Sequence, residues 1–435
     1  MGSYTTTEEI RSGVETVIYR GYRNVDRASV AIKLFRSATP TSRQIAKLRH
    51  EYAITRDLDL SGVVKAYGLE RVGASLALVT ESIEEQPLSD ILQAQRLSLR
   101  AALQIADSVT DALDAIHRRH IIHKDIQPQN ILVHTETLQI KLVDFGIATR
   151  LSQEIQRAAS PDSLEGTLSY MSPEQTGRMN RALDHRTDLY SLGVTLYEML
   201  TGELPFPATD PLELVQSHVA RQPTPPHERA PGVPEAVSNI VVKLLSKTAE
   251  DRYQSADGLR ADLRECLEQL QATGRVTPFQ LGRYDRGHGL LLPQKLYGRD
   301  AEIAALLAAW ERASRGAAEL ALISGHAGIG KSAVVSELHR AIAERGARFI
   351  AGKFDQFNRS VPYASLAQAF RDLVRHLLTE RGEALSRLRR KLATALGQSG
   401  QVLVDLMPEL ELVIGPQPPV PELGAAESQN RLNLV

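Results

Sequence analysis

The sequence predicts an α+β domain in roughly the first 270 residues, with strands first and helices afterwards, and a second, α/β domain beyond it. Short β-rich apolar segments open the chain, and helical periodicity dominates from about residue 99 to residue 270. A stretch rich in Gly, Pro, Arg and Thr then breaks the pattern. The length of 435 residues exceeds what one core of ~100–200 residues needs. We therefore predict domains at 1–270 and 294–435, joined by a linker at 271–293.

The strand-rich opening is typical of a small antiparallel sheet. Residues 16–20 and 29–35 are predicted to form two strands around a turn, and residues 41–58 a polar helix. A fully apolar strand is predicted at 76–80, after which the chain becomes polar. These segments predict a sheet with one accompanying helix.

Helices are expected to dominate the next part of the chain. One segment carries apolar residues at spacings of three and four, which predicts one buried helical face. These residues are Leu99, Leu103, Ala106, Val109, Leu113 and Ile116. Further helices are predicted at 188–200, 239–245 and 256–270, and Gly202 is a usual C-terminal cap for the first of them.

Composition and charge exclude several kinds of partner. The net charge is −1 and charged residues are interspersed, so no basic patch indicates binding to nucleic acid or to an anionic membrane. No run of ~18 apolar residues could span a bilayer. Cys266 is the only cysteine, which excludes an internal disulfide framework and leads us to expect a cytoplasmic protein.

Three segments that contain charged residues follow one another in the first domain. Residues 30–33 (VAIK) form a strand that ends in lysine, residues 123–130 (HKDIQPQN) follow the long amphipathic helix, and residues 144–146 (DFG) follow a short apolar strand. Their order and spacing resemble the lysine strand, the catalytic loop and the metal-binding DFG segment of protein kinases. The resemblance implies a bilobal protein-kinase fold, with a β-rich N-terminal lobe and a helical C-terminal lobe.

The resemblance also implies a role for each polar residue, with ATP and Mg²⁺ as the cofactors. Lys33 would bind the ATP phosphates, and Glu51 of the following helix would fix its ammonium. Asp125 would accept a proton from the substrate hydroxyl or orient it. Asn130 and Asp144 would bind the metal.

The likeness to the family continues beyond these residues. Residues 166–174 resemble the end of an activation segment, and residues 188–193 resemble the start of the central buried helix. The resemblance implies that Asp188 holds the catalytic-loop backbone and that Arg252 pairs with Glu174. By position, Thr80 would be the gatekeeper of the adenine site. The hinge would run over the next three residues, from Glu81 to Ile83.

Three departures from the family matter for activity. The Gly-rich loop keeps one glycine, because alignment places Arg11, Gly13 and Thr16 at the three glycine positions. Lys124 stands where arginine precedes the catalytic aspartate, and lysine lacks the bidentate fork that grips a phosphorylated loop. We therefore expect activity to depend weakly, or not at all, on phosphorylation of that loop. Gln127 replaces a lysine that balances charge on the moving phosphoryl group, which could lower the rate.

A second nucleotide site is predicted after the linker. Residues 325–332 (GHAGIGKS) fit the phosphate-binding P-loop completely, between a predicted strand at 319–324 and a predicted helix at 332–344. The backbone amides around the glycines would wrap the phosphates, together with the helix N-terminus. Lys331 would reach the β- and γ-phosphates, and Ser332 would bind Mg²⁺. The glycines of this site are Gly325, Gly328 and Gly330.

The second domain resembles ATPase modules of the AAA-like and signal-transduction NTPase families, through residues 296–300 (LYGRD). The whole chain is similar to large bacterial signalling proteins that continue into sensor and histidine-kinase regions. Residues 402–405 are the only candidate for the acidic Walker B strand, and they fit an amphipathic helix better. A further strand is predicted at 348–352. We therefore expect an incomplete ATPase domain, in a fragment of a longer protein.

The leading functional expectation is a serine/threonine protein kinase fused to a nucleotide-binding module. Neither Gln127 nor Gln129 supplies the cations that separate serine/threonine kinases from tyrosine kinases, so this preference rests on Pro128 and the overall match. One alternative is a pseudokinase that serves as a binding module, and another is an NTPase switch with an accessory kinase-like domain. Expected partners are protein substrates with Ser or Thr hydroxyls. These include the chain itself and downstream sensor or histidine-kinase regions.

Overall fold

The computed structural model falls into two compact units, residues 1–344 and residues 345–435, which we describe separately. The structure describes residues 3–73, 75–150, 154–155, 167–176, 182–208, 210–285, 298–326, 329–331, 334–335, 338, 342, 350, 352, 364–378, 391–392, 394, 396, 400–407 and 410–418. Within these residues, no helix is both long and apolar enough to cross a membrane.

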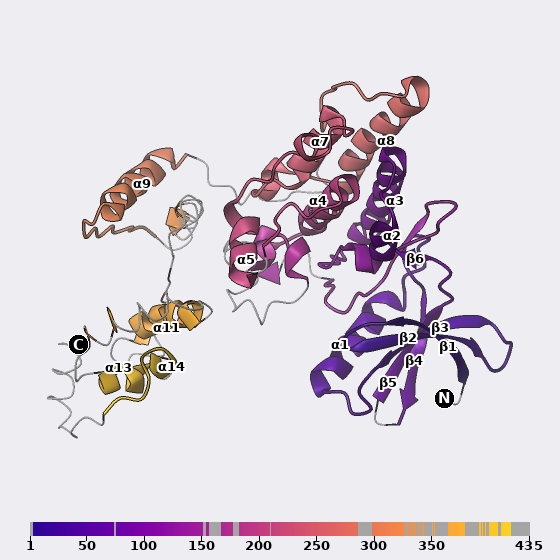
Figure 1. The fold of residues 1–435 in the computed structure, drawn as a ribbon, viewed down its shortest axis with the longest axis horizontal. Helices are drawn as coiled ribbons and strands as arrows, with labels where there is room; N and C mark the ends of the chain where they lie inside the picture. The colour runs from indigo at the N-terminus through magenta and orange to yellow at the C-terminus, as the bar shows by residue number, and fades with distance from the viewer. Residues whose placement is uncertain are drawn as a thin grey trace. The chain divides into compact units, whose positions relative to one another are not determined.

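The N-terminal lobe is built on a five-stranded antiparallel sheet with the strand order β1-β2-β3-β5-β4 (Figure 1). Its strands are β1 (Tyr4–Ser12), β2 (Thr16–Arg23), β3 (Ser29–Phe35), β4 (Ala66–Val72) and β5 (Ser75–Glu81). The strands predicted at 16–20, 29–35 and 76–80 are confirmed. Strands β1 and β4 were not predicted. β1 is an edge strand whose residues are almost all exposed or half-exposed, so it has no apolar alternation to detect.

Helix α1 (Ser42–Thr55) packs against β4 and β5 and confirms the predicted polar helix. It begins with a capping box, in which Thr41 accepts from the Gln44 amide and the Gln44 side chain accepts from the Thr41 amide. Leu48 contacts the sheet in a small apolar cluster. Glu51 is also buried, which is unusual for a carboxylate and requires a partner.

The C-terminal lobe is mainly helical. Its helices are α2 (Leu88–Ala94), α3 (Leu99–His117), α4 (Arg186–Thr201), α5 (Pro211–Ala220), α6 (Pro226–Arg229), α7 (Glu235–Leu244) and α8 (Ala256–Thr273). The apolar face predicted for α3 is buried in the main hydrophobic core. Gly202 ends α4 in the left-handed conformation, with φ 76°, as the sequence predicted. Gly193 lets α4 approach α7, because a Cβ there would lie 2.7 Å from Leu244 Cβ.

Short elements carry the segments that matter for function. Strands β6 (Gln86–Pro87), β7 (Ile131–Val133) and β8 (Ile140–Leu142) form a small sheet in the order β6-β7-β8, and η1 (Pro128–Asn130) leads into β7. Beyond β8 come β9 (Glu154–Ile155), η3 (Leu168–Tyr170), η4 (Pro173–Thr176), β10 (Ala182–Leu183) and η5 (Ala249–Asp251). Pairing of β7 with β8 therefore brings the segment before β7 close to the segment after β8.

The chain folds back onto the C-terminal lobe after α8. Gly274 caps the helix with φ 71°, and Val276, Phe279 and Leu281 pack against the main core. The Asp285 carboxylate then accepts hydrogen bonds from the backbone just before α8. The first half of the stretch predicted as a linker thus covers the kinase-like lobe.

The region after residue 298 is described in separate pieces. Helix α9 (Asp300–Ser314) agrees with the helix that the sequence predicts at residues 301–313. Residues 319–324 were predicted as a strand, but they form none, and Leu320 is 96% exposed. A strand needs a neighbouring strand for its hydrogen bonds, and the described residues provide none there. The strand predicted at 348–352 lies largely outside the described residues.

The second unit contains three described helices, α11 (Ala364–Leu378), α13 (Gly400–Leu406) and α14 (Glu411–Ile414). They share an apolar cluster, with Ala367 and Val374 of α11 facing residues of the other two helices. Residues 402–405 lie within α13, so the helical interpretation of this acidic segment is confirmed.

Candidate active site

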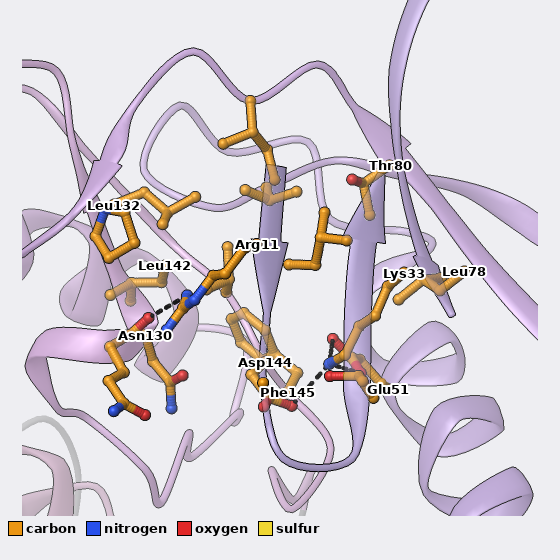
Figure 2. Close-up of a pocket in the computed structure, with 18 of the residues that line it drawn as sticks. Arg11, Lys33, Glu51, Leu78, Thr80, Asn130, Leu132, Leu142, Asp144 and Phe145 are labelled. Atoms are coloured by element: carbon orange, nitrogen blue, oxygen red, sulfur yellow. Dashed lines mark hydrogen bonds and ion pairs between the residues drawn. The ribbon is translucent and has the colours of Figure 1, made fainter. Parts of the chain in front are cut away.

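A cavity of about 230 Å³ separates the five-stranded sheet from the small β6-β7-β8 sheet (Figure 2). Residues from both lobes line it, including Lys33 from β3, Glu51 from α1, Asn130 from η1 and Asp144 after β8. These polar groups lie at one end of the cavity. The lining also includes apolar side chains from both lobes: Ile18, Val64, Ala66, Leu78, Leu132 and Leu142. The cavity therefore suits a ligand with an apolar part and a polar, charged part.

Lys33 is held by two carboxylates, as Figure 2 shows. Its Nζ lies 2.9 Å from Glu51 Oε2 and 3.2 Å from Asp144 Oδ1. Burial alone would lower the pKa of Lys33, but the charges of Asp144 and Glu51 outweigh burial and raise it. The lysine is thus a fixed cation, and the predicted pairing with Glu51 is present.

Asp144 is fixed in an unusual backbone conformation. Its φ is 65°, in the left-handed region that residues other than glycine seldom adopt. Burial would raise the pKa of its carboxyl, but Lys33 and then Lys47 outweigh burial and hold the pKa at about 2. The carboxylate is therefore ionised at neutral pH, as a metal ligand must be.

The backbone of the catalytic loop is bound by a buried aspartate. Asp188 Oδ2 accepts from the His123 amide at 2.9 Å, and Asp188 Oδ1 accepts from the Lys124 amide at 2.8 Å. His117 Nε2 lies 2.8 Å from the same carboxylate. Lys124 has φ 67°, so these bonds hold another strained residue in place. The structural role expected for Asp188 is confirmed.

His123 connects the catalytic loop to the DFG segment. The Asp125 amide donates to His123 Nδ1 at 3.3 Å, so the other ring nitrogen donates to the Val143 carbonyl, at 3.1 Å. The ring also lies against Phe145, with centroids 4.5 Å apart. The imidazole thus positions both acidic segments through the backbone rather than binding a ligand itself.

Asp125 faces the end of the activation segment. Its Oδ2 accepts from Asn130 Nδ2 at 2.9 Å, and its Oδ1 accepts from the Thr167 amide at 3.1 Å. Burial, with the nearby charge of Asp144, raises the pKa of the Asp125 carboxyl. Gln127 Nε2 donates to Thr167 Oγ1 at 2.6 Å. A carboxylate with a raised pKa is better suited to accept a proton than an ordinary one.

Asn130 and Asp144 form a donor set that fits Mg²⁺. The Asn130 amide nitrogen is used in bonds to the Asp125 carbonyl and carboxylate, so its oxygen is the atom left for a metal. Among the described residues, no group of three or more His, Cys, Asp and Glu side chains could hold a metal ion. Mg²⁺ is commonly bound by one or two protein oxygens together with substrate phosphates, so this pair is sufficient.

Helix η4, near the end of the activation segment, is bonded to the C-terminal lobe. Arg252 makes two parallel bonds to Glu174, with Nη1–Oε1 at 2.6 Å and Nη2–Oε2 at 2.8 Å. Gln175 Nε2 donates to the Lys124 carbonyl at 2.7 Å, which ties this segment to the catalytic loop. The predicted Arg252–Glu174 pair is therefore confirmed.

Thr80 and Ile83, two residues of the predicted adenine site, line the cavity. Glu81 is not among the lining residues, and its carboxylate binds the Lys65 amide and the Lys141 ammonium. The role of residues 81–83 as the hinge stays a prediction. The apolar walls include Ile18 of β2 and Leu78 of β5, on strands that the sequence predicted, whereas β4, which carries Ala66, was not predicted. Pairing of residues 66–72 with the apolar strand at 76–80 could have revealed β4.

The hairpin between β1 and β2 forms another wall of the cavity. Gly13, Thr16 and Arg11, which align with the family glycines, all line it. The Gly13 amide donates to the Thr16 carbonyl at 2.8 Å and closes the turn. Arg11 Nη1 donates to the Gln129 carbonyl at 3.0 Å, a contact that the sequence did not predict.

The P-loop is described only in part. Lys331 Nζ lies 2.8 Å from the carbonyls of both Gly325 and His326, so the loop wraps around its ammonium. Gly330 has φ 95°, a conformation that favours glycine. Gly328 and Ser332 lie outside the described residues.

Comparisons with known proteins identify two families in this chain. Residues 4–263 match the family described as "Protein kinase domain", and residues 295–435 match the family described as "AAA ATPase domain". Serine/threonine-protein kinase PknB of Mycobacterium tuberculosis is 36% identical over 187 residues, which cover 43% of this chain and 29% of that protein. A probable serine/threonine-protein kinase of Clostridium perfringens is 31% identical over 272 residues, covering 62% of this chain and 39% of that protein.

A third relative is aligned over most of the chain. Hybrid signal transduction histidine kinase G of Dictyostelium discoideum is 30% identical over 426 residues, covering 78% of this chain. The chain covers 12% of the length of that protein, and less than two fifths of the two kinases above.

Proposed function

The chain belongs to the protein kinase family, and from this premise we propose that it transfers the γ-phosphate of ATP to Ser or Thr hydroxyls of proteins. One observation carries the proposal. Lys33, Asn130 and Asp144 line a single cavity, and Asp125 is hydrogen-bonded to Asn130 at its edge. These are the four groups that phosphoryl transfer in this family requires.

The residues divide the work of binding ATP. Asn130 and Asp144 would hold Mg²⁺, which neutralises charge on the phosphates when bound. Lys33, fixed by Glu51, would bind phosphate oxygens at the same end of the cavity. The base would lie among the apolar side chains near Thr80.

Asp125 would orient the substrate hydroxyl and accept its proton. The carboxylate is held from two sides, by Asn130 and by the Thr167 amide, so it points in one direction without rearrangement. Its raised pKa favours proton acceptance. The preference for Ser and Thr over Tyr is supported by the names of the related kinases and by Pro128 beside Gln127.

We propose that the kinase works in signal transduction, together with nucleotide binding by the AAA ATPase domain through Lys331. The proposed substrates are Ser or Thr residues of other proteins, of the chain itself, or of sensor and histidine-kinase regions. The similarity to a hybrid histidine kinase supports the last of these. We propose the cytoplasm as the location, as the sequence led us to expect.

A second candidate is a pseudokinase that binds partners without transferring phosphate. Two observations favour it: the Gly-rich hairpin keeps only Gly13, and the neutral Gln127 occupies the position beside Asp125. Both weaken the handling of phosphate charge.

The test is transfer of labelled γ-phosphate to a generic protein such as casein, followed by phosphoamino-acid analysis. We expect phosphoserine or phosphothreonine from the wild type. Asp125→Asn and Asp144→Asn should each lower the rate at least 100-fold, because each removes a group that acts on the transferred phosphoryl group or the hydroxyl.

The matched control is Asp59→Asn, which changes an exposed carboxylate whose one bond partner among the described residues is Lys65 on the surface. It should leave the rate within twofold of the wild type. Tight ATP binding without transfer, unaffected by Asp125→Asn, would instead support the pseudokinase.

A further inference from the structure

Arg11 joins the two lobes across the nucleotide cavity. It lies near the end of β1, just before the Gly13 turn, and its Nη1 donates to the Gln129 carbonyl at 3.0 Å. The two residues are 118 positions apart, and both line the cavity. Figure 2 shows the Arg11 side chain extending from the hairpin toward the side where Asn130 lies.

Arg11 also forms no ion pair with the residues that the structure describes. Arg11 and Lys33 are the two cations among the residues that line the cavity. Lys33 is neutralised by Glu51 and Asp144, whereas the bond to the Gln129 carbonyl is the one that the described residues show for Arg11. A guanidinium has five N–H donors, so several stay available to a ligand.

The location of Arg11 indicates which part of the ligand it faces. Gln129 precedes the proposed metal ligand Asn130 and lies three residues before Leu132, which lines the cavity as one of its apolar side chains. Arg11 therefore lies between the end that suits the base and the end that holds the metal. The phosphate chain of a nucleotide begins in that interval, and guanidinium groups bind phosphate oxygens strongly.

We propose that Arg11 is a nucleotide-binding residue, whose guanidinium bonds a phosphate oxygen of ATP while it holds the β1–β2 hairpin against Gln129. This inference rests on the proposed function, because it takes ATP as the ligand of the cavity. A loop that has lost its glycines brings its backbone amides less close to the phosphates. The Arg11 side chain would make this phosphate contact instead.

The test measures dissociation constants of adenosine, AMP, ADP and ATP by calorimetry. The full chain carrying Lys331→Ala is used, so that the P-loop does not contribute. Arg11→Gln and Arg11→Ala are each expected to weaken ADP and ATP at least tenfold and to leave adenosine within twofold. Arg11→Lys should restore part of the affinity for ATP, because it keeps the charge but not the fork.

The matched control is Arg20→Gln on β2, an arginine that pairs with Glu8 and does not line the cavity. It should change none of the four constants by more than twofold. An equal loss for adenosine and ATP, or unchanged ATP affinity in both Arg11→Gln and Arg11→Ala, would overturn the proposal. The binding series needs no phosphate transfer, so it tests Arg11 separately from the proposed activity.

Discussion

Gln127 places a neutral amide beside the carboxylate that would orient the substrate. The residue is 5% exposed, and its amide nitrogen donates to Thr167 Oγ1, in the residue whose backbone amide binds Asp125. We expect Gln127→Lys to raise kcat about tenfold, which corresponds to ~1.4 kcal/mol of transition-state stabilisation. The reason is that an ammonium stabilises developing negative charge better than an amide. Rates of γ-phosphate transfer at saturating ATP would measure this.

Gln127→Met provides the matched comparison, because it keeps the length of the side chain and removes both the amide and any charge. It should be slower than the wild type. A lysine variant no faster than the methionine variant would contradict the view that charge at this position limits the rate.

Contacts between motif residues could be predicted from the sequence, whereas other contacts could not. The Lys33–Glu51 and Arg252–Glu174 pairs were predicted, because the family motifs fix both partners. The bond from Arg11 to Gln129 joins a side chain to a carbonyl 118 residues away, and no sequence pattern marks a backbone acceptor. Such contacts depend on how the hairpin leans over the cavity, which is a property of the folded lobe.

At the scale of elements, periodicity predicted the long buried helix α3 and missed the exposed edge strand β1. Helix α3 has a full apolar face, so its 3.6-residue period was clear. The exposed edge strand β1 has no such pattern. The segment after α8 was predicted as a linker from its Gly, Pro, Arg and Thr content. Its few apolar residues nevertheless pack on the core, because single apolar side chains without a period can still be buried.

Asp285 fastens this segment to the start of α8. Its Oδ2 accepts from the Gln254 amide at 2.7 Å, and its Oδ1 accepts from the Ser255 amide at 3.0 Å. Gly258 permits the close approach, because a Cβ there would lie 2.6 Å from Asp285 Cα. We expect Asp285→Ala to speed hydrogen exchange of these two amides about tenfold, since charged hydrogen bonds contribute ~1.5–3 kcal/mol.

Exchange would be followed by mass spectrometry on peptides covering residues 250–260. Asp257→Ala is the matched control, because this aspartate lies in the first turn of α8 and makes a solvent-exposed pair with Arg118. Such pairs contribute little, so its effect should be several-fold smaller. Equal protection in Asp285→Ala and the wild type would show that the segment is not held by this carboxylate.

At the scale of the whole molecule, the two proposed nucleotide sites are built on different principles. The kinase cavity relies on side chains from both lobes, among them Lys33 and Asp144. The P-loop relies on a short continuous segment around Lys331. The continuous motif could be predicted from the sequence, because all its parts are neighbours in the chain. The strand predicted before it was wrong, because a strand depends on partners elsewhere.

These two sites should bind nucleotide separately, because each has its own lysine. Equilibrium dialysis with Mg²⁺ and a non-hydrolysable ATP analogue should give two nucleotides per wild-type chain. Lys33→Met and Lys331→Ala should each reduce the number to one, and the double variant should bind none above background. If either single variant bound none, the sites would have to be coupled. If the wild type bound only one nucleotide, one of the two lysines would not belong to a nucleotide site. That lysine would be the one whose variant still binds one nucleotide.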